Sequence, residues 1–111
     1  MSGRRYRVEW AEVARKDLFG IVDDLVARSP DAALSTLDRL QRRADSLKTA
    51  PGRGRLVPEL ERLQVRQYRE LVVSPYRLIY RISESAVLVL GVFDSRRNLE
   101  DILLERLVGG R

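Results

Sequence analysis

The sequence of 111 residues contains neither cysteine nor histidine. Without cysteine there can be no disulfide bond, zinc thiolate or thiol nucleophile. Without histidine the chain lacks the commonest general base near neutral pH and the commonest transition-metal ligand. We therefore expect it to hold no metal and no cofactor.

Long hydrophobic segments are missing as well. The longest apolar run, residues 86–93, is far too short to cross a bilayer. The first residues are not followed by an apolar stretch of signal-peptide length. These features predict a cytoplasmic protein that does not insert into membranes. With 44% hydrophobic and 33% charged residues, we expect one folded domain over residues 1–111.

The positive charge is concentrated in the middle of the chain. The formal net charge is +5, and residues 51–81 carry seven arginines against three glutamates. Lys16 and Lys48 are the only lysines, so the cations are nearly all arginine, which suits paired contacts to carboxylate or phosphate. Such a surplus favours an anionic partner, either nucleic acid or an acidic protein segment.

Two helices are predicted in the first half of the chain. Apolar residues at helical spacing indicate a helix over residues 11–28, with Asp17 on its solvent-facing side. Ser29 can cap a second helix and Pro30 fits its first position, and this helix should run to about Lys48. Facing apolar stripes on two antiparallel helices predict a helical hairpin.

A strand begins the chain and a meander dominates its second half. The predicted strands are residues 6–10, 67–73, 76–83 and 86–93. Two-residue connections make the last three antiparallel neighbours. Residues 86–93 scarcely alternate between apolar and polar, so both faces of this strand should be covered and it should be central in the sheet.

The remaining segments are assigned to loops and a final helix. Residues 56–63 are expected to be irregular, and Asn98 should cap a short terminal helix that ends at Gly109-Gly110. The predicted fold class is α+β, with the order β-α-α-β-β-β(-α) and a small antiparallel sheet packed against the helical hairpin.

Several segments in this order resemble one known family. They are Ala14-x-x-Asp17-Leu18-x-x-Ile21, Ser29-Pro-Asp-Ala-Ala33, Leu47-x-x-x-Pro51, Gly54-Arg55, Val57-Pro-Glu-Leu60, Tyr68-Arg-Glu-Leu71, Tyr76-Arg-Leu-Ile-Tyr-Arg81 and Arg96-Arg97. Together they resemble the ParE/RelE-like toxins of type II toxin–antitoxin systems, and more closely the ParE (plasmid stabilisation) branch. The resemblance covers about residues 6–100 and implies a curved antiparallel sheet against a helical hairpin.

The resemblance allows two functions. RelE-like members are ribosome-dependent endoribonucleases that cut messenger RNA, whereas ParE-like members inhibit DNA gyrase without a catalytic site of their own. By the resemblance, Arg77 and Arg96 match phosphate-binding arginines of the ribonucleases, and Arg69 stands where those enzymes carry a catalytic lysine. Ile102 stands where they carry a tyrosine.

RNA cleavage through the 2′-hydroxyl also needs a base and an acid, and these are poorly supplied. An arginine side chain stays protonated and cannot readily act as a base. The remaining candidates are Tyr68, Tyr76, Tyr80, Glu70 and Asp94, and of these Tyr68 or Tyr80 would serve a ribonuclease. The tyrosines fit better as sheet residues, and the two carboxylates fit better as partners of nearby arginines. The sequence therefore favours a non-enzymatic toxin that binds a protein target, by family analogy DNA gyrase. A ribosome-dependent endoribonuclease and a simple basic binding domain remain as alternatives.

The resemblance also implies a cognate antitoxin with an acidic, amphipathic C-terminal segment, and hence a toxin–antitoxin hetero-oligomer. This segment is expected along the helical hairpin and the sheet edge. Glu70 and Asp94 are expected to pair with nearby arginines, with Arg77 and Arg81 reaching Glu70 across the strand hairpin. The candidate residues for target or antitoxin binding are Arg39, Arg42, Arg43, Arg69, Arg77, Arg81, Arg96 and Arg97.

Overall fold

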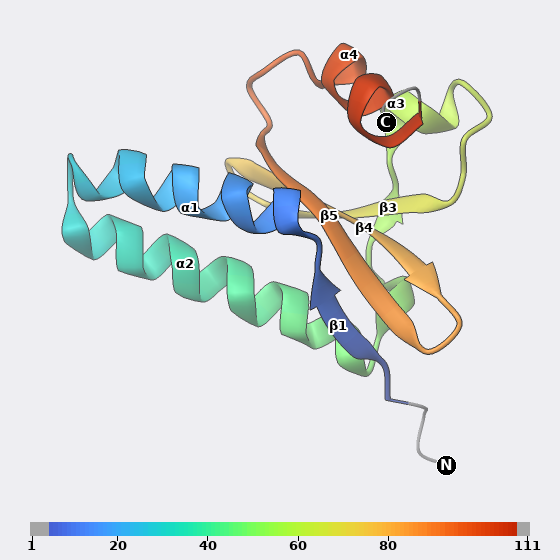
Figure 1. The fold of residues 1–111 in the computed structure, drawn as a ribbon, viewed down its shortest axis with the longest axis horizontal. Helices are drawn as coiled ribbons and strands as arrows, with labels where there is room; N and C mark the ends of the chain where they lie inside the picture. The colour runs from blue at the N-terminus through green and yellow to red at the C-terminus, as the bar shows by residue number, and fades with distance from the viewer. Residues whose placement is uncertain (1–4, 109–111) are drawn as a thin grey trace.

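The computed structural model describes residues 5–108. Its elements are β1 (Arg7–Trp10), α1 (Glu12–Val26), α2 (Pro30–Asp45), β2 (Arg55–Leu56), α3 (Pro58–Glu61), β3 (Tyr68–Val73), β4 (Tyr76–Ser83), β5 (Ala86–Asp94) and α4 (Leu99–Leu103). Single turns follow α2 (Ser46–Lys48), precede β2 (Pro51–Arg53) and extend α4 (Leu104–Val108). The predicted order of elements is confirmed, with β2 and α3 added between the helical hairpin and the meander (Figure 1).

Helices α1 and α2 form the predicted hairpin and lie side by side against one face of the sheet (Figure 1). The Ser29 hydroxyl accepts the Ala32 N–H at 3.2 Å, and Pro30 occupies the first helical position, which confirms the predicted start of α2. Leu18 and Leu40 are buried against the sheet, as their spacing predicts. Helix α2 ends at Asp45, and the chain reaches Lys48 through a 3₁₀ turn.

The five strands form one sheet in the order β1-β5-β4-β3-β2. Neighbouring strands from β5 to β2 are antiparallel, whereas β1 pairs with β5 in parallel. The helical hairpin connects β1 to the rest of the chain, and this long connection lets the strand return in parallel at the edge. Both faces of β5 are covered, as its continuous apolar sequence predicts, but β5 lies second from the edge, between β1 and β4, and β4 is the central strand. The α+β class is confirmed.

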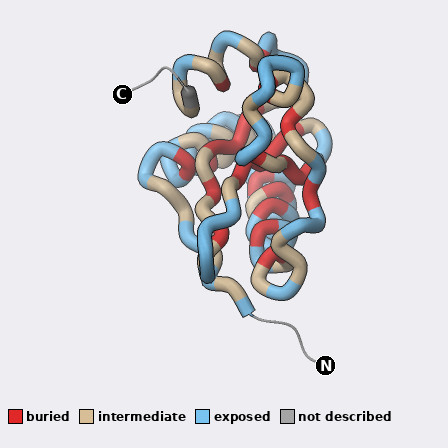
Figure 2. Tube along the Cα trace, turned by 90° about the vertical axis from the view of Figure 1, so that its right-hand side faces the viewer, coloured by how far each residue is buried: buried red, intermediate tan, exposed pale blue. Residues whose placement is uncertain are grey.

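The opposite face of the sheet is covered by α3, α4 and the turn after α4. Val57, Leu60, Leu99 and Leu103 pack there against Ile79 of β4 and its neighbours. Buried segments therefore lie on both sides of the strands, and exposed residues on the outside (Figure 2).

Two predictions for the second half of the chain have mixed outcomes. The expectation that residues 56–63 are irregular is wrong, because Pro58 starts one helical turn with Val57 and Leu60 fully buried. Asn98 does cap the terminal helix, and its side chain accepts the Glu100 N–H at 3.3 Å. The predicted end at Gly109-Gly110 lies outside the described residues. No helix within residues 5–108 is long and apolar enough to cross a membrane.

Candidate functional site: the arginines of the sheet and its rim

Arg77 of β4 lies at the centre of a buried ion-pair cluster. Its Nε donates to Glu70 Oε1 at 2.6 Å, and its Nη1 and Nη2 each donate to a Glu59 oxygen at 2.7 Å. The Glu70 side chain is fully buried and that of Arg77 is 9% exposed. The predicted pairing of Arg77 with Glu70 is confirmed, whereas the contribution of Glu59 from α3 was not foreseen.

Arg55 of β2 completes this cluster from the outside. Its Nε donates to the second Glu70 oxygen, Oε2, at 2.7 Å, so two arginines and two glutamates balance each other. The hydrogen bond from Arg77 holds the pKa of Glu59 below its ordinary value, and the bond from Glu59 raises the pKa of Arg77. Both Glu59 and Arg77 therefore stay ionised at neutral pH. The Arg77 guanidinium is bound along both its edges by carboxylates.

Arg69 and Tyr80 lie on the other face of the sheet. They are register partners on β3 and β4, and side chains alternate between the two faces along a strand, so Arg69 and Arg77 point to opposite sides. Arg69 Nη1 donates to the Gly54 carbonyl at 2.8 Å. The structure thus separates two of the three arginines that match the ribonuclease positions.

Both candidate tyrosines hold the fold together through their hydroxyl groups. Tyr80 is fully buried; its hydroxyl donates to the Pro51 carbonyl at 2.7 Å and accepts the Gly54 N–H at 2.9 Å. Burial raises the pKa of this hydroxyl. A Cβ at Gly54 would come within 2.7 Å of the same oxygen, so only glycine fits there. The Tyr68 hydroxyl donates to the Leu107 carbonyl at 3.1 Å.

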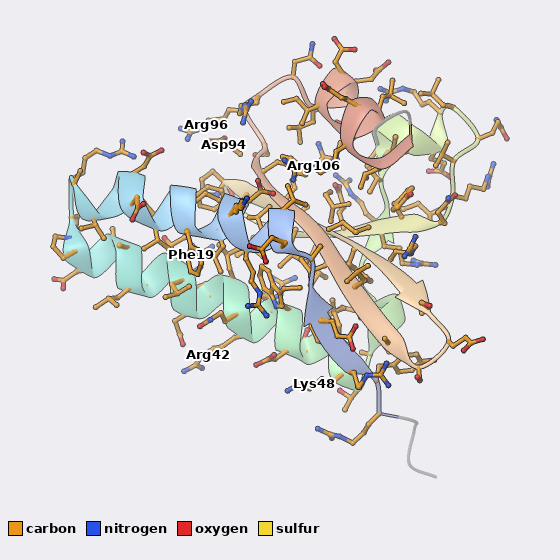
Figure 3. All side chains as sticks on the ribbon, viewed as in Figure 1. Phe19, Arg42, Lys48, Asp94, Arg96 and Arg106 are labelled. Carbon is orange, nitrogen blue, oxygen red and sulfur yellow. The ribbon has the colours of Figure 1, made fainter. Side chains whose placement is uncertain are left out.

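Arg96 lies in the exposed loop between β5 and α4. It pairs with Asp94, as predicted, through Nε to Oδ1 at 2.9 Å and Nη2 to Oδ2 at 2.5 Å. Figure 3 places this pair on the outside of the molecule. The hydrogen bond from Arg96 lowers the pKa of Asp94 to about 2. The neighbouring Arg97 is exposed as well.

A groove with a volume of about 530 Å³ runs between α1, the end of β5 and the terminal helix. Its basic lining residues are Lys16, Arg28, Arg96, Arg97 and Arg106. Arg106 donates to Asp17 Oδ2 at 2.6 Å, and its guanidinium lies 4.8 Å from the centre of the Phe93 ring. Because Asp94 and Asp17 neutralise Arg96 and Arg106, the groove is only mildly positive.

The expectation that Asp17 faces solvent is wrong. Its side chain is 17% exposed, and Oδ2 also accepts the Val92 N–H at 3.0 Å. Asp17 therefore joins α1 to β5 and to the terminal helix. The signals in the sequence are its place beside Leu18, at the margin of the apolar stripe, and its place in the first segment that resembles the toxin family. Arg106 has no such signal, because its partner lies 89 residues away.

The arginines of α2 divide into two groups. Arg39 and Arg43 reach β3: Arg39 Nη2 donates to the Ser74 carbonyl at 2.9 Å, and Arg43 Nη1 to the Val72 carbonyl at 3.5 Å. Arg42 instead pairs with Asp38 at 2.9 Å on the exposed side of the helix. Arg81, near the end of β4, is partly exposed and lies opposite Tyr68 of β3. Its expected pairing with Glu70 is not formed, because Glu70 lies opposite Ile79 and its two oxygens are bonded to Arg55 and Arg77. The predicted binding residues thus lie at several separate places.

The described residues contain no cluster of acidic side chains that could hold a metal ion. What they offer is a set of cations, some neutralised in the interior and others at a sheet edge or in a loop. Such an arrangement can bind acidic surfaces. Among the described residues, no side chain that could transfer a proton and is free of other hydrogen bonds lies beside two of the arginines Arg69, Arg77 and Arg96.

Comparison with known proteins gives a family and a fold. The family model described as the ParE toxin of type II toxin–antitoxin system, parDE, matches residues 8–99. The comparison with curated protein sequences gives no match.

Two solved structures illustrate the shared fold. The chromosomal ParDE system from P. aeruginosa is 20% identical, with a TM-score of 0.67, and the match covers 81% of this chain and 96% of the other. The RelBE2 toxin–antitoxin complex from Mycobacterium tuberculosis is 22% identical, with a TM-score of 0.56, and the match covers 82% and 92% of the two chains. Identities this low support the fold alone.

Proposed function

Since this chain belongs to the ParE toxin family of type II toxin–antitoxin systems, we propose that it inhibits bacterial growth by binding a protein target in the cytoplasm. By analogy with the ParE branch, that target is DNA gyrase. The toxin acts in this proposal without a catalytic step of its own.

The state of Arg77 is the observation that carries this proposal. A ribonuclease of the RelE type would use this arginine on the scissile phosphate, where its positive charge stabilises the transition state. Here two carboxylates occupy the guanidinium, and the cluster includes a second cation, Arg55, on Glu70. A phosphate would have to displace charge-assisted hydrogen bonds in a buried position, which is costly.

The proton-transfer candidates support the same conclusion. Tyr80 is buried with its hydroxyl bonded twice, and Tyr68 is bonded to the terminal helix. Burial raises the pKa of Tyr80 and makes it a poorer base at neutral pH. Arg69, on the opposite sheet face, cannot join Arg77 in one site.

We also propose that a cognate antitoxin holds this toxin inactive. The two solved structures described above are of toxin–antitoxin systems. An acidic, amphipathic antitoxin segment would find on the helical hairpin both exposed apolar side chains, Phe19 of α1 and Leu34 of α2, and the arginines of α2. Such a segment orders on binding and forms a hetero-oligomer.

The test is induced expression in a susceptible bacterium, with DNA and protein synthesis followed in parallel by pulse labelling. Purified toxin is added in a second assay to gyrase during DNA supercoiling. An early stop in DNA synthesis together with inhibited supercoiling is expected. An early stop in protein synthesis, with messages cut on ribosomes, would instead establish the endoribonuclease alternative. No effect on either process would contradict both.

A further inference from the structure

Half of one sheet edge is left without a neighbouring strand. Strand β2 pairs with β3 only through Arg55 and Leu56, which face Glu70 and Arg69. The rest of β3, up to Val73, has β4 on one side, and within residues 5–108 no further strand pairs with its other side. Val72 is 46% exposed on this edge.

The backbone of this edge points outward in a regular pattern. The Tyr68 carbonyl accepts the Val57 N–H at 3.2 Å, and the Val72 and Ser74 carbonyls accept the side chains of Arg43 and Arg39. These three carbonyls, of Tyr68, Val72 and Ser74, are an even number of residues apart and all face away from β4. In an antiparallel strand a residue's N–H and carbonyl point to the same side, so the Val72 N–H also faces outward.

Two arginine side chains of α2, those of Arg39 and Arg43, reach this edge of the sheet. Arg39 and Arg43 are one helical turn apart, and within the described residues neither forms an ion pair, whereas Arg42 between them is held by Asp38. Their present acceptors are neutral carbonyls. A carboxylate is a stronger acceptor for a guanidinium, so an acidic chain on this edge would gain two charge-assisted hydrogen bonds.

We propose that the edge at Val72–Ser74 accepts an extended, acidic segment of the antitoxin as an added strand. Its backbone pairs with Val72, and its carboxylates bind Arg39 and Arg43. Strand addition to an exposed sheet edge gives affinity through main-chain hydrogen bonds and specificity through side chains. This inference rests on the proposed antitoxin partnership and names the site and the form of the bound segment.

Charge favours the acidic segment over a second copy of this chain. In edge-to-edge pairing of two copies, Arg39 and Arg43 of α2 beside each β3 edge would meet those of the other copy, and like charges in such positions are destabilising. The same cations discourage aggregation through the open edge. The same two arginines that repel a second copy of this chain would attract an acidic strand.

One matched pair of variants tests the backbone part. Val72→Pro removes the outward N–H without removing a ladder hydrogen bond to β4, whereas Val72→Ala removes apolar surface and keeps the N–H. Antitoxin co-expressed from the neighbouring reading frame is purified in complex with toxin, separated and titrated onto each variant. Val72→Pro should weaken binding at least about tenfold relative to Val72→Ala. Equal affinities would overturn the proposal.

A second set tests the charges and stays informative if Val72→Pro fails to fold. The double variant Arg39→Glu/Arg43→Glu should weaken binding by roughly 30-fold or more, while Arg42→Glu, on the same helix, should change it much less. Hydrogen exchange should show the Val72 amide slowing in the wild-type complex relative to free toxin. Equal exchange in both, or protection in free toxin that rises with its concentration, would contradict an antitoxin strand.

Growth assays separate this inference from the proposed function. Toxicity in the absence of antitoxin reports on the target, and rescue by antitoxin reports on the edge. A Val72→Pro toxin that still stops growth but is no longer neutralised supports the added strand. A wild-type toxin that leaves growth unaffected would remove the proposed function, while the titrations and the exchange data would still decide the edge proposal.

Discussion

The two faces of the sheet are held by different forces. The hairpin face is covered by close apolar packing of residues such as Leu18, Leu40 and Leu78. The face under α3 and α4 also has an apolar core. Its covering elements are in addition fixed to the sheet by polar contacts between residues distant in sequence, the Arg77–Glu59 ion pair and the hydrogen bond from Tyr68 to Leu107. Apolar packing is indifferent to pH, whereas ion pairs depend on it, so the faces should respond differently to acid.

The largest effect is expected from Arg77→Ala. The change leaves Glu59 and Glu70 without their common cation, one of them fully buried, and should cost about 3–5 kcal/mol of unfolding free energy at neutral pH. Urea unfolding measures it. The control on the hairpin face is Leu40→Ala, with a cost of about 2–5 kcal/mol from the cavity it creates.

The pH dependence separates these two variants. In Arg77→Ala, Glu59 loses the hydrogen bond that holds its pKa down. Protonation of Glu59 on acidification therefore costs the variant less stability than it costs the wild type, and the deficit in unfolding free energy narrows as the pH falls. The deficit of Leu40→Ala should stay constant between pH 7 and pH 4. Parallel curves for both variants would refute the contrast between the faces.

A second prediction concerns the carboxylate supplied by α3. The pKa of Glu59 is lowered in the folded state, chiefly by its hydrogen bond from Arg77. A lowered folded pKa gives stability that is present above the unfolded pKa and is lost as the pH falls through the folded pKa. Glu59→Gln should therefore cost about 1.5–3 kcal/mol at pH 7 and show a flatter loss of stability below pH 4.5. Glu61→Gln on the same short helix is the control.

The contacts of Asp17, which join α1 to Arg106 and to β5, should contribute less to the free energy of unfolding than the buried ion pairs of Arg77. Asp17→Ala removes the acceptor for Arg106 and for the Val92 N–H and should cost about 1–3 kcal/mol. Hydrogen exchange should accelerate first in the turn after α4, because this turn loses its anchor on α1. If exchange instead accelerates uniformly across α1 and α2, Asp17 stabilises the hairpin and not the terminal helix.

The same contrast explains what the sequence could predict. The hairpin, the meander and the interior place of β5 follow from local periodicity, and the Arg77–Glu70 pair follows from the register of a two-residue hairpin. The short elements β2 and α3 were missed, because two and four residues carry no periodic signal.

The missed parts of the site have a common cause. Glu59 reaches Arg77 only because α3 folds over the sheet, and Asp17 meets Arg106 across 89 residues. The family positions alone placed Arg69, Arg77 and Arg96 in one candidate site. The alternation of side chains on β3 puts Arg69 on the far face, and two glutamates neutralise Arg77.

The smallest effect on stability is expected from Arg96→Ala, and this sharpens the contrast between a buried and an exposed arginine. The Arg96 side chain is 75% exposed, and within residues 5–108 its ion pair is with Asp94 at the end of β5. Exposed ion pairs contribute little because water and salt screen them, so the urea midpoint should stay that of the wild type. The control is Arg97→Ala, which should be equally silent. Any loss of growth inhibition in Arg96→Ala could then be assigned to target binding, whereas the same loss in Arg77→Ala would also reflect unfolding. An Arg96→Ala protein that is markedly less stable would show that this loop supports the fold, and the division between structural and available arginines would fail.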